Sequence, residues 1–537
     1  MAYEAKWAND PSKLNKTELL KLEKDGLDVF EDIYRYSKLG FDAITPEDFD
    51  RFKWAGVYQQ KPKKGHFMMR VRIPSGILTS EQARTLAGIS RDFGRGLVDV
   101  TTRQSVQFHW LTIENIPAIF ERLASVGLSS TEACGDCPRN IVGNPLAGID
   151  PNELIDTRPI VKEVADFFLG NRDFSNLPRK YKISISANIY NAGHAEINDL
   201  AFTPATKEID GEEVVGFHVW VGGGLSAKPF LAKQLDVFVR PEEVLKVAIG
   251  VTTIFRDFGY REKRNHARLK FLVNDWGPEK FREELLKLTG ELPTRGVDRV
   301  VGWNAGYFTG VHKQKQPGLN YVGLSVPVGR MNADELEELA RLADVYGDGT
   351  VRTCNSQNVV IPGIPDEKLT AFLGEKLLER LTPFPKTFIG HAVSCTGIEF
   401  CNLALVETKE RMREIATYLD EHVQLDTPIR LHVNGCPNSC GQQQVADIGL
   451  QGSLMKTENG MVDAFDLSVG GTLGPGATFN TKLKGRIPAD QVAPVLARLI
   501  TFYKENRLEG EPFHAYVKRV GVQTIQEQLD DILAAHV

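Results

Sequence analysis

Two stretches of this chain resemble each other, and this internal repeat limits the possible fold more than any other feature of the sequence. FMMRVRIPSGILTSEQ, which begins at Phe67, aligns with NYVGLSVPVGRMNADE, which begins at Asn320. The same offset aligns VDVTTRQSVQF at Val98 with VRTCNSQNVVI at Val351. Self-similarity at a fixed offset is the signature of a duplicated structural unit. We therefore expect two copies of one fold within the chain.

Each copy of this unit reads as a strand, a turn and a helix. Apolar residues alternate along the segment 67–73, as they do in a strand with one buried face. Both helices are predicted to begin with a capping box, formed by Thr79 with Gln82 in the first copy and by Asn332 with Glu335 in the second. Each copy is therefore a small α+β unit.

A second, strand-rich unit is also repeated, at a slightly smaller offset. INDLAF at Ile197 aligns with VADIGL at Val445, and GFHVWVGGGL at Gly216 aligns with AFDLSVGGTL at Ala464. The repeated segments keep their order along the chain. We therefore predict an α+β protein with pseudo-twofold symmetry and with ligands at the seam between its halves.

Composition and charge narrow the class of protein. The 537 residues are 42% hydrophobic and 25% charged, with a net charge of −6, which is typical of a globular protein. No apolar run approaches the ~18 residues of a membrane span, and the segment MAYEAKWANDPSK is unlike a secretory signal. We expect a soluble, cytoplasmic protein without membrane or nucleic-acid partners. Lys61, Lys63 and Lys64 form a local basic cluster, either a solvated loop or a docking site.

Arginines distinguish the two copies of the smaller unit. Arg70 and Arg72 lie two residues apart on one strand and so point to the same face. The second copy has Gly323 and Ser325 at these positions, and a serine where the first copy has Arg103. The shared fold therefore does not require arginine at these sites. The alternatives are an anion-binding site in the first half or arginines on a solvated strand face.

Cysteines distinguish the copies of the larger unit. Seven cysteines are a small and odd number for a secreted disulfide framework. Four of them lie in two short segments, Cys395 and Cys401 in SCTGIEFCN, and Cys436 and Cys440 in NGCPNSCGQ. Four thiolates can hold an iron–sulfur cluster or a structural zinc. The wide gap after Cys395 is poor for a zinc knuckle, so the spacing favours the cluster.

These two cysteine motifs together resemble the siroheme and [4Fe–4S] sulfite and nitrite reductases of the ferredoxin-dependent, assimilatory type. The resemblance covers the duplicated layout from about Trp54 to the C-terminus. It implies an oxidoreductase with two cofactors, siroheme and a [4Fe–4S] cluster. It also implies that the cluster is bound by all four thiolates and that Cys440 bridges to the siroheme iron; the implied ligands are Cys395, Cys401, Cys436 and Cys440.

The resemblance also assigns roles to basic residues of the first half. It implies a substrate site made of Arg70, Arg139, Lys180 and Lys182. It implies contacts to the siroheme carboxylates or their surroundings from Arg103, Gln107, His109 and Arg179. A macrocycle with many carboxylates needs many cations. A histidine such as His109, taken alone, is more often a core residue. Lysines can lose a proton when neighbouring cations lower their pKa, so the two lysines are the predicted proton donors.

The resemblance leaves two substrates open. Lys182 and Tyr58 follow the sulfite-reductase pattern, and in some members this tyrosine is crosslinked to a cysteine, which would be Cys134 here. Nitrite reductases usually carry asparagine at the position of Lys182. The segment NSCGQQQVADIG, in contrast, resembles plant-type nitrite reductases. We expect six-electron reduction of sulfite to sulfide, with nitrite reduction to ammonia as the alternative.

No dinucleotide-binding fingerprint is visible, so we expect a small acidic ferredoxin as electron donor, with a separate flavoprotein as the alternative. A colourless protein with a structural zinc and an iron–sulfur carrier without siroheme are the remaining alternatives for function. We expect a monomer. The predicted domains are an N-terminal helical wrap at 1–60, a first ferredoxin-like half-domain at 61–130, a first siroheme-binding domain at 131–306, a second half-domain at 307–388 and a [4Fe–4S]/siroheme domain at 389–537.

Overall fold

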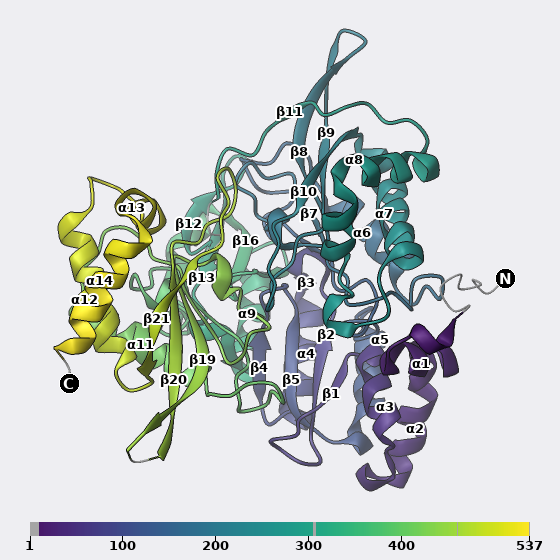
Figure 1. The fold of residues 1–537 in the computed structure, drawn as a ribbon, viewed down its shortest axis with the longest axis horizontal. Helices are drawn as coiled ribbons and strands as arrows, with labels where there is room; N and C mark the ends of the chain where they lie inside the picture. The colour runs from purple at the N-terminus through teal and green to yellow at the C-terminus, as the bar shows by residue number, and fades with distance from the viewer. Residues whose placement is uncertain (1–9, 304–307, 459, 536–537) are drawn as a thin grey trace.

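The computed structural model describes residues 10–303, 308–458 and 460–535, and its strands form four sheets (Figure 1). Two sheets belong to the smaller repeated unit and two to the larger one. In the view of Figure 1, the long hairpins of the two larger sheets point to opposite ends of the molecule. The duplication predicted from the sequence is therefore confirmed.

The two smaller sheets exchange one strand with each other. The order in the first sheet is β1 (Val57–Gln59), β2 (Phe67–Val71), β5 (Val106–Leu111), β4 (Leu97–Val100) and β14 (Arg330–Asn332). The order in the second is β12 (Gly310–Lys313), β13 (Leu319–Leu324), β16 (Val359–Pro365), β15 (Thr350–Thr353) and β3 (Ile77–Thr79). Thus β14 of the second copy completes the first sheet and β3 of the first copy completes the second. β1 precedes residue 60, where the sequence suggested a domain boundary.

Both capping boxes form as predicted. Thr79 caps α4 (Ser80–Phe93) with Gln82, and Asn332 caps α9 (Ala333–Tyr346) with Glu335. The two helices pack against each other, and the half-domains share one continuous apolar core. β2 alternates buried and half-buried residues, as its sequence pattern indicated. Two shorter helices complete the units, α5 (Ile116–Ser125) and α10 (Asp366–Leu373).

The two larger sheets share a path of five strands, in which three parallel strands come first, the third forms a hairpin with an antiparallel fourth, and the fifth lies at the edge. The first contains β6 (Val142–Gly143), β7 (Ile183–Ile185), β8 (Leu200–Ile209), β9 (Glu212–Val221) and β10 (Lys233–Val239), with β11 (Val297–Asp298) paired to β8. The second contains β17 (Ala392–Ser394), β18 (Leu431–Asn434), β19 (Ile448–Thr457), β20 (Gly460–Val469) and β21 (Thr481–Pro488). The first three strands of each sheet are parallel, so their carboxyl ends meet at one edge.

Helices cover each larger sheet and the outside of the first half-domain. The first sheet is accompanied by α6 (Arg158–Phe168), α7 (Val244–Phe258) and α8 (Leu269–Thr289), and the second by α11 (Lys409–His422), α12 (Val492–Asn506), α13 (Phe513–Val520) and α14 (Val522–Ala534). The N-terminal segment forms α1 (Lys16–Glu23), α2 (Val29–Leu39) and α3 (Pro46–Arg51), drawn in purple beside α5 in Figure 1. Among the described residues, no helix is both long enough and apolar enough to cross a membrane.

The two halves meet through residues at equivalent positions of the repeat. Ile197 and Val445 come from the aligned segments INDLAF and VADIGL, and they pack together with Leu225 and Leu473 in a small buried cluster. Pairing of equivalent residues is what a pseudo-twofold axis requires. The seam between the halves therefore passes through this cluster.

Candidate active site

The loops that carry the four cysteines come together because their strands are parallel neighbours. Cys395 directly follows β17, and Cys436 and Cys440 follow β18. Burial, and then the nearby Cys440, raise the pKa of the Cys395 thiol to about 12. Cys440 also raises the pKa values of Cys401 and Cys436, after burial as the larger cause. Cys440 is thus close enough to influence each of the other three thiols, and Cys401 to influence Cys436.

Backbone N–H groups point at two of these sulfur atoms. Gly435 N–H donates to Cys395 Sγ at 3.2 Å, and Leu403 N–H donates to Cys401 Sγ at 3.5 Å. A side chain on Gly435 would not fit, because its Cβ would lie 2.7 Å from the Cβ of Ala404. Such N–H contacts stabilise thiolates and tune the potential of iron–sulfur clusters.

The same donors do not form a site for one metal ion. In the described ranges of the chain, no three His, Cys, Asp or Glu side chains converge as single-ion ligands do. A zinc site needs four ligands at ~2.0–2.3 Å from one point. Four thiols on two neighbouring loops, with backbone N–H donors at two of the sulfur atoms, fit a larger [4Fe–4S] cluster instead.

Arg70 projects from β2 into a polar group of side chains beside these loops. Its Nε and one terminal nitrogen donate to Gln107 Oε1 at 2.9 and 2.6 Å, from the paired position on β5. Its other terminal nitrogen lies 3.5 Å from Cys134 Sγ. Burial raises the pKa of Cys401, and Arg70 opposes this rise with a smaller contribution that lowers the pKa. Gln107 therefore positions this arginine between the first half and the cysteine loops.

Arg139 and the phenol of Tyr58 surround the same Cys134. Burial, and then Cys134, raise the pKa of Tyr58, and the two side chains share a hydrogen bond. Burial opposes the charge of Arg139, but Tyr58 and Cys134 raise the pKa of its guanidinium above the usual value. Arg139 is held by the carbonyl of Gly135, at 3.0 and 2.8 Å from its nitrogens. The structure thus brings the predicted Tyr58 and Cys134 into contact.

The two predicted lysines lie in this positive region. Burial, and then Arg268, lower the pKa of Lys180 to about 7. Burial, and then Lys180 and Arg103, hold the pKa of Lys182 well below its usual range. Lowering of lysine pKa values by neighbouring cations is the expected result of placing like charges together. An anionic ligand would relieve this repulsion.

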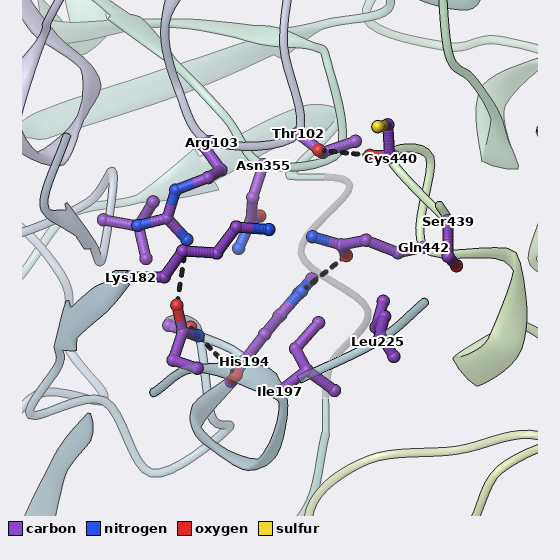
Figure 2. A pocket seen from close by; sticks show the side chains of 13 residues that line it. Thr102, Arg103, Lys182, His194, Ile197, Leu225, Asn355, Ser439, Cys440 and Gln442 are labelled. Carbon is purple, nitrogen blue, oxygen red and sulfur yellow. Dashed lines mark hydrogen bonds between the residues drawn. The ribbon is translucent and has the colours of Figure 1, made fainter. Parts of the chain in front are cut away.

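A pocket opens between the first-half cations and Cys440, at the seam of the molecule. Arg103, Lys182, His194 and Asn355 face Cys440 across it (Figure 2). Three buried polar atoms of these side chains find no hydrogen-bond partner in the part of the chain that the structure describes, namely Arg103 Nε, His194 Nε2 and Asn355 Oδ1. Burial, and then Arg139, lower the pKa of Arg103 to about 9. Arg103 Nε is a donor and fits a carboxylate of a ligand such as siroheme. His194 Nε2 and Asn355 Oδ1 are acceptors, because His194 Nδ1 donates to Gln442 and the Asn355 amide donates to the carbonyl of Ala192, so they fit a donor group or water.

Two residues that the sequence suggested for ligand binding, His109 and Arg72, make buried contacts within the protein. His109 is fully buried on β5, where its ring nitrogens contact Gln60 at 2.9 Å and Asp99 at 2.8 Å. Its ring stacks on that of Phe400, which lies between Cys395 and Cys401 in the sequence, with the ring centroids 4.0 Å apart. Both ring nitrogens of His109 therefore have partners within the protein, and its predicted place at siroheme or its surroundings stays a prediction. Arg72 is buried as well and donates to backbone carbonyls of the 132–138 segment.

Arg179 is partly exposed at the rim of the positive region. Burial, and then Arg264, lower the pKa of its guanidinium to about 10. Its nearest carboxylate oxygen belongs to Asp136, at 3.8 Å. A siroheme contact from Arg179 stays a prediction.

Reasoning from the sequence missed His194, Asn355 and Arg268. The repeat contained one signal for His194, because it aligns with Gln442, two residues after Cys440. The two residues have left-handed backbones and contact each other, His194 Nδ1 to Gln442 Oε1, at 3.1 Å. Equivalent residues that meet on the pseudo-twofold axis mark the seam, and therefore the pocket.

Known protein families match most of the chain. The model of the nitrite and sulphite reductase 4Fe-4S domain matches residues 134–291 and 387–536, and that of the nitrite/sulfite reductase ferredoxin-like half domain matches 58–126 and 312–376. Ferredoxin–nitrite reductase of Synechococcus elongatus is 43% identical, over 91% of this chain and 96% of the relative. Sulfite reductase [ferredoxin] 1 of Mycolicibacterium paratuberculosis is 38% identical, over 97% and 98%. The solved structure of Mycobacterium tuberculosis NirA has a TM-score of 0.90, 38% identity and coverage of 96% and 97%.

Proposed function

Because this chain belongs to the family of nitrite and sulphite reductases with a 4Fe-4S domain, we propose that it reduces sulfite to sulfide with six electrons from ferredoxin. Nitrite reduction to ammonia is the second candidate. The observation that carries the proposal is the group of first-half cations opposite Cys440 at the seam. One half supplies an anion site and the other supplies the thiolates.

The four thiolates are the proposed ligands of the [4Fe–4S] cluster, and Cys440 is the proposed bridge to siroheme. When bound, siroheme supplies an iron that accepts the substrate and passes electrons to it. Arg103 fits its carboxylates through the unpartnered Nε, and His194 and Asn355 offer acceptor atoms beside the same pocket. Gln107 supports the site indirectly, through its contacts to Arg70.

The chain's own cations bind the substrate and move protons in this proposal. Arg70 and Arg139 hold the oxygens of the anion, because guanidinium groups stay charged and offer paired donors. Lys180, with its pKa of about 7, can both carry a proton and release it near neutral pH. Lys182 supplies a further positive charge and a second transferable proton. The proton donated by either lysine is replaced from water.

Sulfite is favoured over nitrite by the charge of the pocket. Sulfite is a dianion near neutral pH and nitrite a monoanion, so a further cation at position 182 favours sulfite. Tyr58 and Cys134, the pair that is crosslinked in some sulfite-type members, contact each other, which supports the sulfite alternative. Nitrite is favoured by one specific observation, because the relative with 43% identity is a nitrite reductase. The two readings therefore need a direct measurement.

The cysteine loops also suggest where the electron donor docks. Leu403 and Leu405, which follow Cys401, are 63% and 45% exposed. Asn402 joins this segment to the basic loop, because Lys61 N–H donates to its side chain at 2.6 Å. An apolar centre rimmed by lysines complements an acidic ferredoxin. The basic cluster is thus a proposed docking site, with a separate flavoprotein as the alternative donor.

The site is built from both halves of one chain, so we propose a monomer, and we propose the cytoplasm as its location. Light scattering measures the first and fractionation of the source cells the second. A mass corresponding to two chains would contradict the monomer.

One experiment tests the main proposal and the choice of substrate. The protein is expressed in a host that makes siroheme, and its visible spectrum is recorded. We expect a green-brown protein that oxidises reduced ferredoxin in the presence of sulfite. A colourless, metal-replete preparation would instead support the zinc alternative, and an iron–sulfur spectrum without siroheme would support a carrier. Steady-state kinetics of Lys182→Asn on both substrates then tests specificity, since unchanged selectivity contradicts the argument from charge.

A further inference from the structure

A buried lysine of the N-terminal wrap reaches two loops of the first larger domain. Lys21, on α1, is 6% exposed. Its ammonium donates to Asp136 at 3.2 Å and to the carbonyl of Leu177 at 2.8 Å. It also pairs with Glu18 on the same helix at 2.5 Å. A long cationic side chain is almost never buried unless its charge is paired with an anion and hydrogen-bonded.

The partners of Lys21 belong to one buried network of charges. Arg264 donates to both oxygens of Asp136, at 2.7 and 2.9 Å. Arg261 donates to Glu18 at 2.8 Å. The charges of Lys21 and Arg264 hold the pKa of the Asp136 carboxyl well below its usual range, despite its burial. Asp136 is therefore a carboxylate at neutral pH, and α1 provides one of its cationic partners.

Both loops that Lys21 contacts carry predicted substrate residues. Asp136 lies between Cys134 and Arg139, and Leu177 precedes Lys180 and Lys182. The loops are also tied to each other. Leu177 N–H donates to the Asp136 carbonyl at 2.9 Å, and Arg139 N–H donates to the carbonyl of Tyr181 at 2.9 Å. A shift of one loop would therefore move the other.

Trp54 of the wrap makes further contacts at and near these loops. The indole of Trp54 donates to the carbonyl of Ser175 at 2.7 Å. Its ring packs against Gly135, where a Cβ would lie only 2.9 Å from the ring. Gly135 is the residue whose carbonyl holds the Arg139 guanidinium. The wrap thus contacts Gly135, whose carbonyl holds Arg139, and Ser175, two residues before Leu177.

We propose that Lys21 is a positioning residue for the reaction, which sets the 134–139 and 177–182 loops, and so the spacing of Arg139, Lys180 and Lys182, for a small oxyanion. This inference rests on the proposed function. The N-terminal wrap is then part of the frame of the anion site. Lys21 acts through Asp136 and Leu177 and touches no substrate.

The test compares, in the holoenzyme, Lys21 on α1 with Lys24 at the C-terminal end of the same helix. Lys21→Met removes the contacts to both loops, whereas Lys24→Met removes only the ion pair to Asp32 within the wrap. We expect Lys21→Met to raise the KM for sulfite about ten-fold with a smaller change in kcat, because misplaced positioning groups cost up to ~10²-fold. Lys24→Met should leave KM unchanged. If Lys21→Met does not fold, Glu18→Gln replaces it, with an expected rise in KM of about three-fold on the same grounds.

A second readout does not depend on turnover. Hydrogen exchange of the peptides that cover 134–139 and 177–182 should be faster in Lys21→Met or Glu18→Gln than in Lys24→Met. Equal KM values and equal exchange in these loops for the variant and its control overturn the positioning role. If the wild type reduces neither sulfite nor nitrite, the proposed function fails, while the exchange comparison still decides whether Lys21 orders the loops.

Discussion

The strands β7 and β18 occupy equivalent places in the two halves, yet the residue in front of each has a different task. Lys182 and Arg430 both donate their backbone N–H to an equivalent aspartate, Asp199 and Asp447, at 2.9 Å. Arg430 then turns its guanidinium onto its own Asp447. In the first half Arg268 occupies that place, and the Lys182 side chain lies in the pocket instead (Figure 2).

This difference shows how a duplicated frame acquires one active site. The backbone contact is retained in both halves, because it fixes the start of a buried strand. The side chains diverge, because Arg430 pairs with its own aspartate whereas Lys182 lines the pocket. The smaller unit differs between the halves in the same way, because Arg70 and Arg103 of the first copy are replaced by Gly323 and Ser356 at the equivalent positions of the second. The second half supplies thiolates at its own loops.

The largest expected effect comes from removing the thiolate that faces the cations. Cys440 lies where the repeat places Ala192 in the first half, so Cys440→Ala makes the two halves alike. We expect loss of the cluster and of siroheme retention, with sulfite reduction below detection, because the proposed bridge is gone. Iron and sulfide content and the visible spectrum measure the change. Cys354→Ala is the control, since Cys354 is buried in a separate small core. Retention of both cofactors by Cys440→Ala would remove this thiolate from the proposed site.

The next effect concerns the first-half lysine with a pKa of about 7. Lys180 is protonated below this pKa, so its proton-donating form is lost as the pH rises through about 7. We expect kcat/KM for sulfite to fall along that limb in the wild type. Lys180→Met should lower kcat about 100-fold, a typical contribution of general acid catalysis, and remove the limb. A limb that persists unchanged in Lys180→Met would assign the titration to another group.

A smaller effect is expected when one half is given the residue of the other. Lys182→Arg introduces the residue found at the equivalent position in the second half. Arginine retains the charge but holds its proton, and it has a planar fork that can compete with Arg268 for Asp199. We expect a fall in kcat of several-fold to about ten-fold with little change in ferric siroheme content. A kcat equal to that of the wild type would show that Lys182 contributes charge and no proton.

The sequence predicted the architecture better than it predicted the contacts of single residues. The offset between copies, the alternation in β2 and both capping boxes depend on local patterns, and the structure confirms them. The parallel order of β17 and β18 explains why distant cysteine motifs meet, but that order is a tertiary property. Strand exchange between β3 and β14 could not be read, because three-residue strands carry little pattern of their own. The roles predicted for the site residues await measurement.

Buried polar residues were the least predictable. His109 and Lys21 look alike in a sequence, as polar residues among apolar ones. Their contacts depend on partners far along the chain, Asp99 and Phe400 for His109, and Asp136 for Lys21. A hydrophobic pattern with a period of 2 or 3.6 residues indicates which face of a strand or helix is buried. It carries no information on which charged side chains pair with each other.

The smallest expected effect tests the symmetry itself. Thr79 and Asn332 cap equivalent helices, and each accepts a hydrogen bond from the backbone N–H of the residue three positions on, Gln82 or Glu335, at 3.1 and 2.8 Å. Both caps are exposed, so Thr79→Ala and Asn332→Ala remove a cap without opening a cavity. Each should lower the free energy of unfolding by ~1 kcal/mol, the usual cost of losing an N-cap. The two losses should agree, because α4 and α9 pack against each other in one core and unfold together. Chemical denaturation of the two variants measures this, and a loss confined to one of them would show that the half-domains, although alike in fold, do not share their stability.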